Sequence, residues 1–298
     1  MAINHPITSY LNFQINKQIT NQKITSTITK NKPNFKHLIS CSSLNSSNVL
    51  LFEAAKHTVD TYVQSGMVVG LGSGVASSMA IEYLGHKLRV GLLNDVVGIP
   101  TSIGSASEAE KAGITLHQQY EDTPHIDFAF NDADIMEERS LNAVIRRQTL
   151  QGGESMLEEK KILDTTQNLV LMVTQKQYKS AVEGSIPVFV ESVSWLNTAE
   201  EIDDLFVGDA EVWRRPAIGH ADPTGGNYPL ITREGHNVLD VIFTSPIPNL
   251  VEVAELLKTI DGVVDHGIIT KTPCTAVIVT ESGLCIIENT LSGDISSL

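Results

Sequence analysis

Two short stretches carry the residues best suited to acid–base chemistry. Residues 126–134 read IDFAFNDAD, an apolar run typical of a buried strand that ends at Asn131 and Asp134. Further along, QGGESMLEEKKIL places Gly152 and Gly153 ahead of a predicted helix that carries Glu159. In α/β proteins strand ends and helix starts usually face one edge of the sheet, so we expect these residues to share a pocket. Carboxylates gathered there are suited to moving protons.

A third stretch, VVGLGSGVASS at residues 68–78, predicts an anion-binding loop. Gly72, Ser73 and Gly74 follow a predicted strand and precede a predicted helix, whose N-terminal N–H groups favour negative charge. The complete dinucleotide fingerprint is absent, so a phosphate monoester fits better than NAD. Each stretch also has a simpler alternative. The loop could be a tight turn, the acids solvated loop residues, and residues 158–161 an exposed helical face.

Strands and helices alternate along the body of the chain. Helical spacing at 49–64 is followed by predicted strands at 67–71, 95–100, 126–130, 169–173 and 186–191, with helical stretches between them. This order predicts a parallel sheet with helices on both faces. Beyond Trp195 the pattern changes to a hairpin at 228–243, an amphipathic helix at 248–260 and a second hairpin at 275–289. We therefore expect a smaller α+β lobe.

Charge is unevenly distributed along the 298 residues. Residues 1–52 contain five of the 21 lysines and arginines and none of the 35 acidic residues, and the first acid is Glu53. A basic, hydroxyl-rich and acid-free leader is typical of an organelle transit peptide, and its Lys and Ser content favours a plastid. The alternative is a tail without a targeting role. The net charge of −14 argues against nucleic-acid and anionic-membrane partners.

Cysteine content and hydropathy exclude further classes of protein. Cys41, Cys274 and Cys285 have no paired spacing, so the sequence supports neither a disulfide framework nor a zinc site. No apolar run approaches the roughly 18–20 residues that a transmembrane helix needs.

The order of these motifs resembles that of type A ribose-5-phosphate isomerases from about Val49 to Asn289. The family's glycine loop, GIPTS strand end, DGADE motif and KGGGG–EK segment have counterparts in four stretches of this chain. The counterparts are GLGSG (70–74), GIPTS (98–102), NDADI (131–135) and LQGGESMLEEK (150–160). Two later matches are IPVFV (186–190) and GVVDHG (262–267).

The resemblance implies a Rossmann-like sheet domain at 49–194 and 269–298, with an inserted α+β lobe at 195–268. It also implies a homodimer or homotetramer without cofactor or metal. The implied reaction interconverts D-ribose 5-phosphate and D-ribulose 5-phosphate through an ene-diolate. Combined with a transit peptide at 1–48, this predicts an enzyme of the chloroplast stroma that serves the pentose phosphate pathway and the Calvin cycle.

The same resemblance implies roles for individual residues. Glu159 matches the proton-shuttling glutamate, and Asp134 matches the second aspartate of DGAD. The matching substrate-binding positions are Gly72, Ser73, Gly74, Asn131, Gly152 and Gly153.

Several positions depart from the family pattern. Asn131 replaces an aspartate, Asp132 a glycine and Leu150 a lysine, and an insertion of about six residues falls within 135–149. Arg146, Arg147 or Lys176 could replace the lost cation, although a solvated loop is the simpler expectation for the two arginines. The alternative function is a catalytically weakened sugar-phosphate-binding or regulatory relative. Transcription regulators and CoA-transferases with related architecture fit less well, because no basic helix-turn-helix is visible and the motifs match them poorly.

Overall fold

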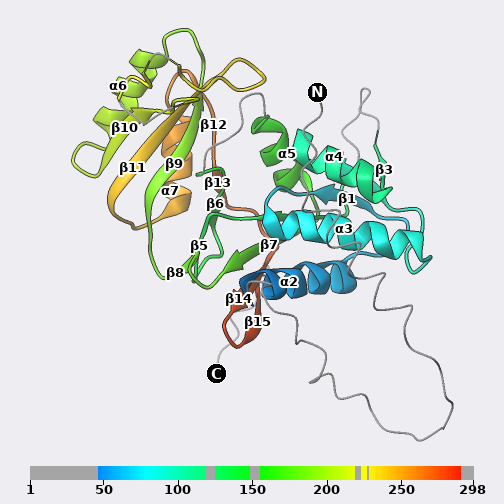
Figure 1. Cartoon of the computed structure of the whole chain (residues 1–298). Coiled ribbons are helices and arrows are strands. Elements are labelled where there is room, and N and C mark those ends of the chain that lie inside the picture. Colours follow the sequence, from blue (N-terminus) through cyan, green and yellow to red (C-terminus); the bar gives the residue numbers. More distant parts are fainter. Residues whose placement is uncertain (1–45, 118–124, 148–154, 219–222, 227, 290–298) are drawn as a thin grey trace, which may run out of the picture. The chain divides into compact units, whose positions relative to one another are not determined.

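The computed structural model describes residues 46–117, 125–147, 155–218, 223–226 and 228–289. Within them, seven strands form a sheet of order β15-β14-β7-β4-β1-β2-β3 (Figure 1). Its strands are β1 (Val68–Leu71), β2 (Val97–Pro100), β3 (Thr115–Leu116), β4 (Phe128–Asp132), β7 (Asn168–Thr174), β14 (Cys274–Thr280) and β15 (Gly283–Asn289). Neighbouring strands are parallel except β14 and β15, which form the hairpin expected at residues 275–289.

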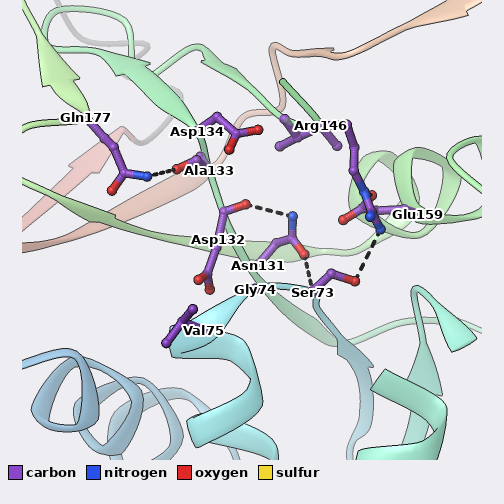
Figure 2. Close-up of a pocket in the computed structure, with 11 residues that line it drawn as sticks. Ser73, Gly74, Val75, Asn131, Asp132, Ala133, Asp134, Arg146, Glu159 and Gln177 are labelled. Atoms are coloured by element: carbon purple, nitrogen blue, oxygen red, sulfur yellow. Dashed lines mark hydrogen bonds and ion pairs between the residues drawn. The ribbon is translucent and has the colours of Figure 1, made fainter. Parts of the chain in front are cut away.

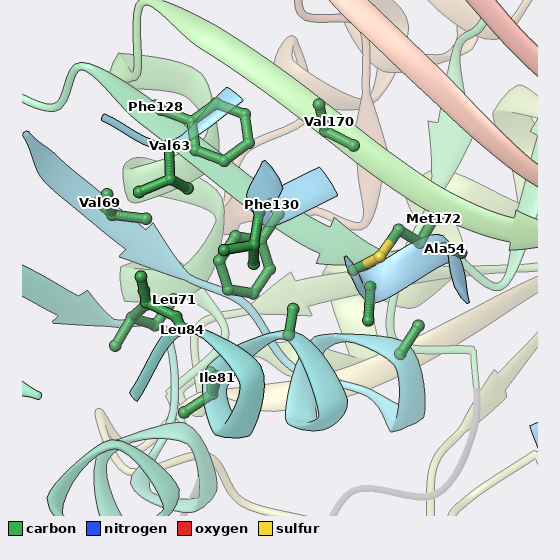
Figure 3. Packing of buried hydrophobic residues seen from close by; sticks show 14 of the residues in the cluster. Ala54, Val63, Val69, Leu71, Ile81, Leu84, Phe128, Phe130, Val170 and Met172 are labelled. Carbon is green, nitrogen blue, oxygen red and sulfur yellow. The ribbon is translucent and has the colours of Figure 1, made fainter. Parts of the chain in front are cut away.

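Helices pack on both faces of this sheet. On one face lie α2 (Ser46–Tyr62), α3 (Val75–Arg89) and α4 (Ile103–Ala112), whose apolar residues join a single core cluster with the sheet (Figure 3). As the helical spacing predicted, Ala54, Ala55 and Val59 of α2 are fully buried. Helix α5 (Leu157–Thr165) contributes Leu163 to the cluster on the opposite face.

Alternation along β4 explains why both faces need cover. Phe128 and Phe130 belong to the cluster with α2 and α3, whereas Ala129 between them belongs to the cluster with α5. Successive side chains of a strand point to opposite faces, so an uninterrupted apolar strand must be covered on both sides. Its last residues, Asn131 and Asp132, therefore lie at the carboxyl edge of a strand that is buried on both faces.

A four-stranded antiparallel sheet of order β10-β11-β9-β12 forms the core of the second lobe. It contains β9 (Val182–Val190), β10 (Ala210–Arg214), β11 (Asn237–Ile247) and β12 (Val263–His266), covered by α6 (Trp195–Leu205) and α7 (Leu250–Lys258). The chain leaves the parallel sheet after β7 and returns to it at β14. The expected α/β class with a smaller lobe is confirmed.

One strand assignment is wrong. The run at 186–191 was expected in the parallel sheet, but it lies in β9, which pairs antiparallel with β11 and β12. A short buried apolar run looks the same in either kind of sheet, which explains the error. A third sheet joins β5 (Ile135–Glu137), β6 (Ala143–Val144), β8 (Tyr178–Lys179) and β13 (Ile268–Ile269).

Candidate active site

The glycine loop packs directly against the end of β4. A Cβ on Gly72 would lie 2.0 Å from the carbonyl oxygen of Phe130, and one on Gly74 would lie 2.3 Å from the carboxylate of Asp132. Gly74 also has φ 123°, a backbone conformation that other residues rarely adopt. Both positions therefore require glycine, which brings the start of α3 into contact with Asn131 and Asp132.

Asn131 holds this junction together with its side-chain amide. Its Oδ1 accepts a hydrogen bond of 2.7 Å from the backbone N–H of Ser73, and its Nδ2 donates one of 2.9 Å to the carbonyl of Asp132. The side chain is 1% exposed. A carboxylate could accept from Ser73 but could not donate to that carbonyl, so the amide is structurally matched to both contacts.

Glu159 and Arg146 form a buried ion pair beside the loop. Glu159 lies in the first turn of α5 and is 1% exposed, and its Oε2 accepts from the Nε of Arg146. The Nη2 of Arg146 also donates to the hydroxyl of Ser73 over 3.3 Å. A solvated loop position is therefore the wrong expectation for Arg146, whose side chain is 13% exposed. It brings a cation to the candidate base.

The second lobe holds the backbone of Arg146 in place. Arg146 has φ 64°, a left-handed conformation that is costly for a residue with a side chain. Its carbonyl accepts a 2.8 Å hydrogen bond from Nη1 of Arg215, and the Nε of Arg215 donates to Asp240 of β11 over 2.8 Å. A buried guanidinium anchored on the antiparallel sheet thus supports the strained residue that faces Glu159.

The other candidate cations lie elsewhere. Arg147 contributes its backbone N–H, which donates to Oδ2 of Asp134 over 2.8 Å, but its guanidinium does not line the pocket. Burial lowers the pKa of Arg147, and Asp134 and Glu183 partly oppose that shift. Lys176 is exposed, whereas its neighbour Gln177 lines the pocket and donates to the carbonyl of Ala133 over 2.9 Å.

Asp132 caps the start of α3. Its Oδ2 accepts from the N–H of Ala76 at 2.9 Å, and its Oδ1 accepts from the N–H and the hydroxyl of Ser77 at 2.8 and 2.7 Å. Burial raises the pKa of Asp132 to about 6, Asp134 adds to the rise, and the hydrogen bonds from Ser77 and Ala76 oppose it. The carboxylate thus binds to the helix end where the sequence predicted an external anion.

These elements enclose a pocket of about 270 Å³ (Figure 2). It is lined by Ser73, Gly74, Val75, Asn131, Asp132, Ala133, Asp134, Ile145, Arg146, Glu159 and Gln177. Five of the residues selected from the sequence therefore line this pocket, namely Ser73, Gly74, Asn131, Asp134 and Glu159. Gly72 packs against the backbone of Phe130 and Asn131 next to it. Gly152 and Gly153 lie outside the described residues.

The arrangement is suited to proton transfer on a small polar molecule. Glu159 supplies an acceptor for a proton, Arg146 a fixed positive charge, and Ser73 and Asp134 groups that can bind hydroxyls. In the part of the chain that the structure describes, no cluster of three His, Cys, Asp or Glu residues is arranged to hold a metal ion. Over the same residues, no helix has the length and apolarity to cross a membrane.

Comparison with known proteins places this geometry in a family. The family model described as "Ribose 5-phosphate isomerase A (phosphoriboisomerase A)" matches residues 97–283. A ribose-5-phosphate isomerase A from Synechococcus is 32% identical over 237 residues, which cover 78% of this chain and 95% of the relative. The chain belongs to the ribose 5-phosphate isomerase A family.

A plant relative and a solved structure extend the likeness. The "Probable ribose-5-phosphate isomerase 2" of Arabidopsis thaliana is 31% identical over 231 residues, or 76% of this chain and 81% of the relative. A D-ribose-5-phosphate isomerase solved in complex with phospho-erythronic acid superposes with a TM-score of 0.70 at 25% identity, covering 81% of this chain and 98% of that one.

Two features of the pocket differ from the simplest expectation from the sequence. Arg146, for which a role as cation was only the alternative to a solvated loop, reaches Glu159 from the inserted stretch at 135–149. Asp132, which the sequence showed only as a replacement for a glycine, caps α3. The Arg-Arg pair shortly before the two glycines was the available signal for the first. For the second there was none, because a capping residue 56 positions from the N–H it accepts from leaves no local pattern.

Proposed function

We propose that this chain interconverts D-ribose 5-phosphate and D-ribulose 5-phosphate. The observation that supports this most directly is the buried carboxylate of Glu159, which faces the pocket together with a guanidinium and the hydroxyl of Ser73. Membership of the ribose 5-phosphate isomerase A family supplies the identity of the substrate. A solved relative with phospho-erythronic acid bound supports a short phosphorylated sugar chain as the ligand.

In the proposed mechanism Glu159 is the base. It removes the proton from C2 of the open-chain aldose, and the C–H electron pair becomes the C1–C2 double bond of the ene-diolate. The aldehyde oxygen gains negative charge, which the guanidinium of Arg146 stabilises. Glu159 then returns the proton to C1, the C2 hydroxyl gives up its proton as the C2 carbonyl forms, the C1 oxygen takes that proton, and the product is the ketose. One carboxylate can serve both carbons because they are adjacent, and such a positioned base typically contributes about 10²–10⁴-fold.

The other lining residues would orient the sugar. Asp134 has one oxygen occupied by the N–H of Arg147, which leaves its second oxygen to accept from a sugar hydroxyl. Ser73 and Gly74 would lie beside the phosphate end of the chain, and Asn131 keeps that loop against β4. The ion pair with Arg146 stabilises the ionised form of Glu159 and so weakens it as a proton acceptor. On substrate binding, Arg146 must therefore share its charge between Glu159 and the sugar oxygen.

The direct test is an isomerase assay on the purified full-length chain. Formation of ribulose 5-phosphate from ribose 5-phosphate should be measurable, and it should disappear in Glu159→Gln. Titration of phospho-erythronic acid by calorimetry separates binding from turnover. Absence of turnover in the unmodified protein would contradict the isomerase proposal.

A second candidate is a catalytically weakened sugar-phosphate-binding or regulatory relative. The observation that favours it is the combination of an ion-paired Glu159 with a pocket in which Asp132 already binds the start of α3. Phospho-erythronic acid that binds to a protein without detectable turnover would support this candidate over the first.

We further propose that the protein acts in the chloroplast stroma, in the pentose phosphate pathway and the Calvin cycle, as a homodimer or homotetramer. The acid-free composition of residues 1–52 supports a transit peptide at 1–48. A fluorescent protein fused to residues 1–48 should enter chloroplasts, and a purely cytosolic signal would contradict this. Sedimentation of the purified chain as a monomer would contradict the oligomer.

A further inference from the structure

Asp132 binds the donors that a phosphate group would need at the glycine loop. Two N–H groups of the first turn of α3 and the hydroxyl of Ser77 all donate to its carboxylate, at 2.7 to 2.9 Å. The residue that opens this turn, Val75, is 58% exposed and offers no side-chain donor. A phosphate entering here would have to displace an anion that is part of the protein.

The charge of the pocket also disfavours the binding of a phosphate. Among the described lining residues, Asp132, Asp134 and Glu159 carry carboxylates, and Arg146 carries the positive charge. Arg146 is already paired with Glu159. Like charges held together in a partly buried pocket disfavour a further anion.

We propose that Asp132 determines ligand specificity in this pocket by competing with the phosphate of the substrate for the first turn of α3. The proposal rests on the proposed function, since it assigns the phosphate end of that substrate to the glycine loop. It makes this chain a weak binder of phosphorylated sugars while the Asp132 carboxylate is ionised. Removal of that charge should tighten binding.

Protonation offers a way to remove the charge without mutation. The pKa of Asp132 is raised to about 6, first by burial and then by Asp134. The other charged groups around it are Glu159 and Arg146 across the pocket and Glu108 of α4, which accepts from Ser78 of α3. Anion affinity should therefore rise as pH falls from about 8 to about 5, the range over which Asp132 gains its proton.

Sulfate is the probe for the test, because it stays doubly charged over this range, whereas a phosphate monoester itself takes up a proton. Calorimetric titration of the full-length chain at about pH 8 should give at least about tenfold tighter sulfate binding in Asp132→Asn and Asp132→Gly than in the unmodified protein. The matched control is Glu82→Gln, the same change of charge on the exposed side of α3. Its sulfate affinity should equal that of the unmodified protein.

Two further readouts guard against loss of the fold. Asp132→Gly removes the cap of α3, so sulfate should raise the melting temperature of that variant more than it raises that of the unmodified protein. If neither variant folds, the pH dependence of sulfate binding to the unmodified chain decides, and an affinity that stays flat from about pH 8 to about pH 5 overturns the proposal.

Sulfate binding also separates this proposal from the proposed function. Turnover of ribose 5-phosphate without any response of sulfate affinity to Asp132 would overturn the specificity role and leave the isomerase intact. A strong response in a protein that never turns over ribose 5-phosphate would contradict the isomerase activity and support the role of Asp132.

Discussion

Two neighbouring residues of α5 form ion pairs in different directions from the helix. Glu159 pairs with Arg146 in the pocket, whereas Lys160 pairs with Asp265 of β12 and donates to the carbonyl of His266 over 2.8 Å. Both helix residues are almost fully buried, at 1% and 5% exposure. Two consecutive residues thus form ion pairs in two different surroundings.

The difference lies in what each pair faces. Lys160 has three acceptors at its ammonium group, including Nδ1 of His266 at 3.1 Å, and it joins α5 to the second lobe. Glu159 faces a cavity, and its partner, Arg146, has a strained backbone conformation. A pair that joins two elements away from a cavity holds those elements together, whereas a pair at a cavity can open when a ligand takes one of its members. We therefore expect Glu159 to govern activity and Lys160 to govern stability.

The largest effect is expected from Glu159→Gln. Loss of the base should lower the isomerase rate by at least about 10³-fold, roughly 4 kcal/mol of barrier, with a melting temperature within a few degrees of the unmodified protein. The matched control is Glu158→Gln, one residue away, where the pair with Arg233 is exposed and worth little. Unchanged turnover in Glu159→Gln would remove Glu159 from the mechanism.

Lys160→Met should have the opposite effect, a loss of stability with the isomerase rate of the folded protein largely kept. It leaves the partly exposed Asp265 and the carbonyl of the buried His266 without their cation, and we expect this to cost about 3 kcal/mol of unfolding free energy. Urea denaturation measures the loss, and Lys161→Met on the exposed side of α5 should leave the free energy of unfolding nearly unchanged. A difference below about 1 kcal/mol between the two variants would contradict the structural role.

Arg146→Met tests whether the cation acts on the reaction. It should lower kcat by about 100-fold, close to 2.7 kcal/mol, because a charge aimed at the ene-diolate oxygen is lost. Arg146→Lys should recover part of that loss, since it restores the charge without the planar fork. A rise of kcat in Arg146→Met would instead show that the arginine restrains Glu159, as the weakened-relative candidate requires.

Residues in regular elements were predictable, and residues joined across the fold were not. The apolar run before Asn131 and the spacing of Ala54 and Val59 dictate a buried strand and a one-sided helix through local periodicity. The placement of Arg146 depends on Arg215, which lies 69 positions away in sequence and belongs to the other lobe. No window of sequence contains that contact.

The family resemblance likewise predicted some residues of the site and not others. It pointed to Glu159 and Asp134, because those positions match its motifs, and the structure brings both to one pocket. It gave no guidance where this chain departs from the pattern. At Asp132 the sequence showed only that a glycine is replaced, while the capping of α3 required the three-dimensional contact with Ala76 and Ser77.

The smallest effect is expected from pH, acting at His266 beside Lys160. Burial and then the charge of Lys160 lower the pKa of His266 to about 4, below its ordinary value of 6.5. Between these values the unfolded chain binds more protons than the folded one. The contribution of neutral His266 to the free energy of unfolding is therefore present above about pH 6.5 and is lost as pH falls towards 4.

The matched variant is His266→Asn, whose side-chain oxygen can replace Nδ1 as the acceptor for the N–H of Ile268. Comparing urea denaturation of the two proteins at about pH 7 and about pH 4 isolates the histidine, because other groups cancel in the difference. Asp132 is among those groups, and its raised pKa acts in the opposite direction, favouring the folded state at low pH. Equal loss of stability in both proteins on acidification would mean that His266 can charge in place, and the effect attributed to its burial beside Lys160 would then be wrong.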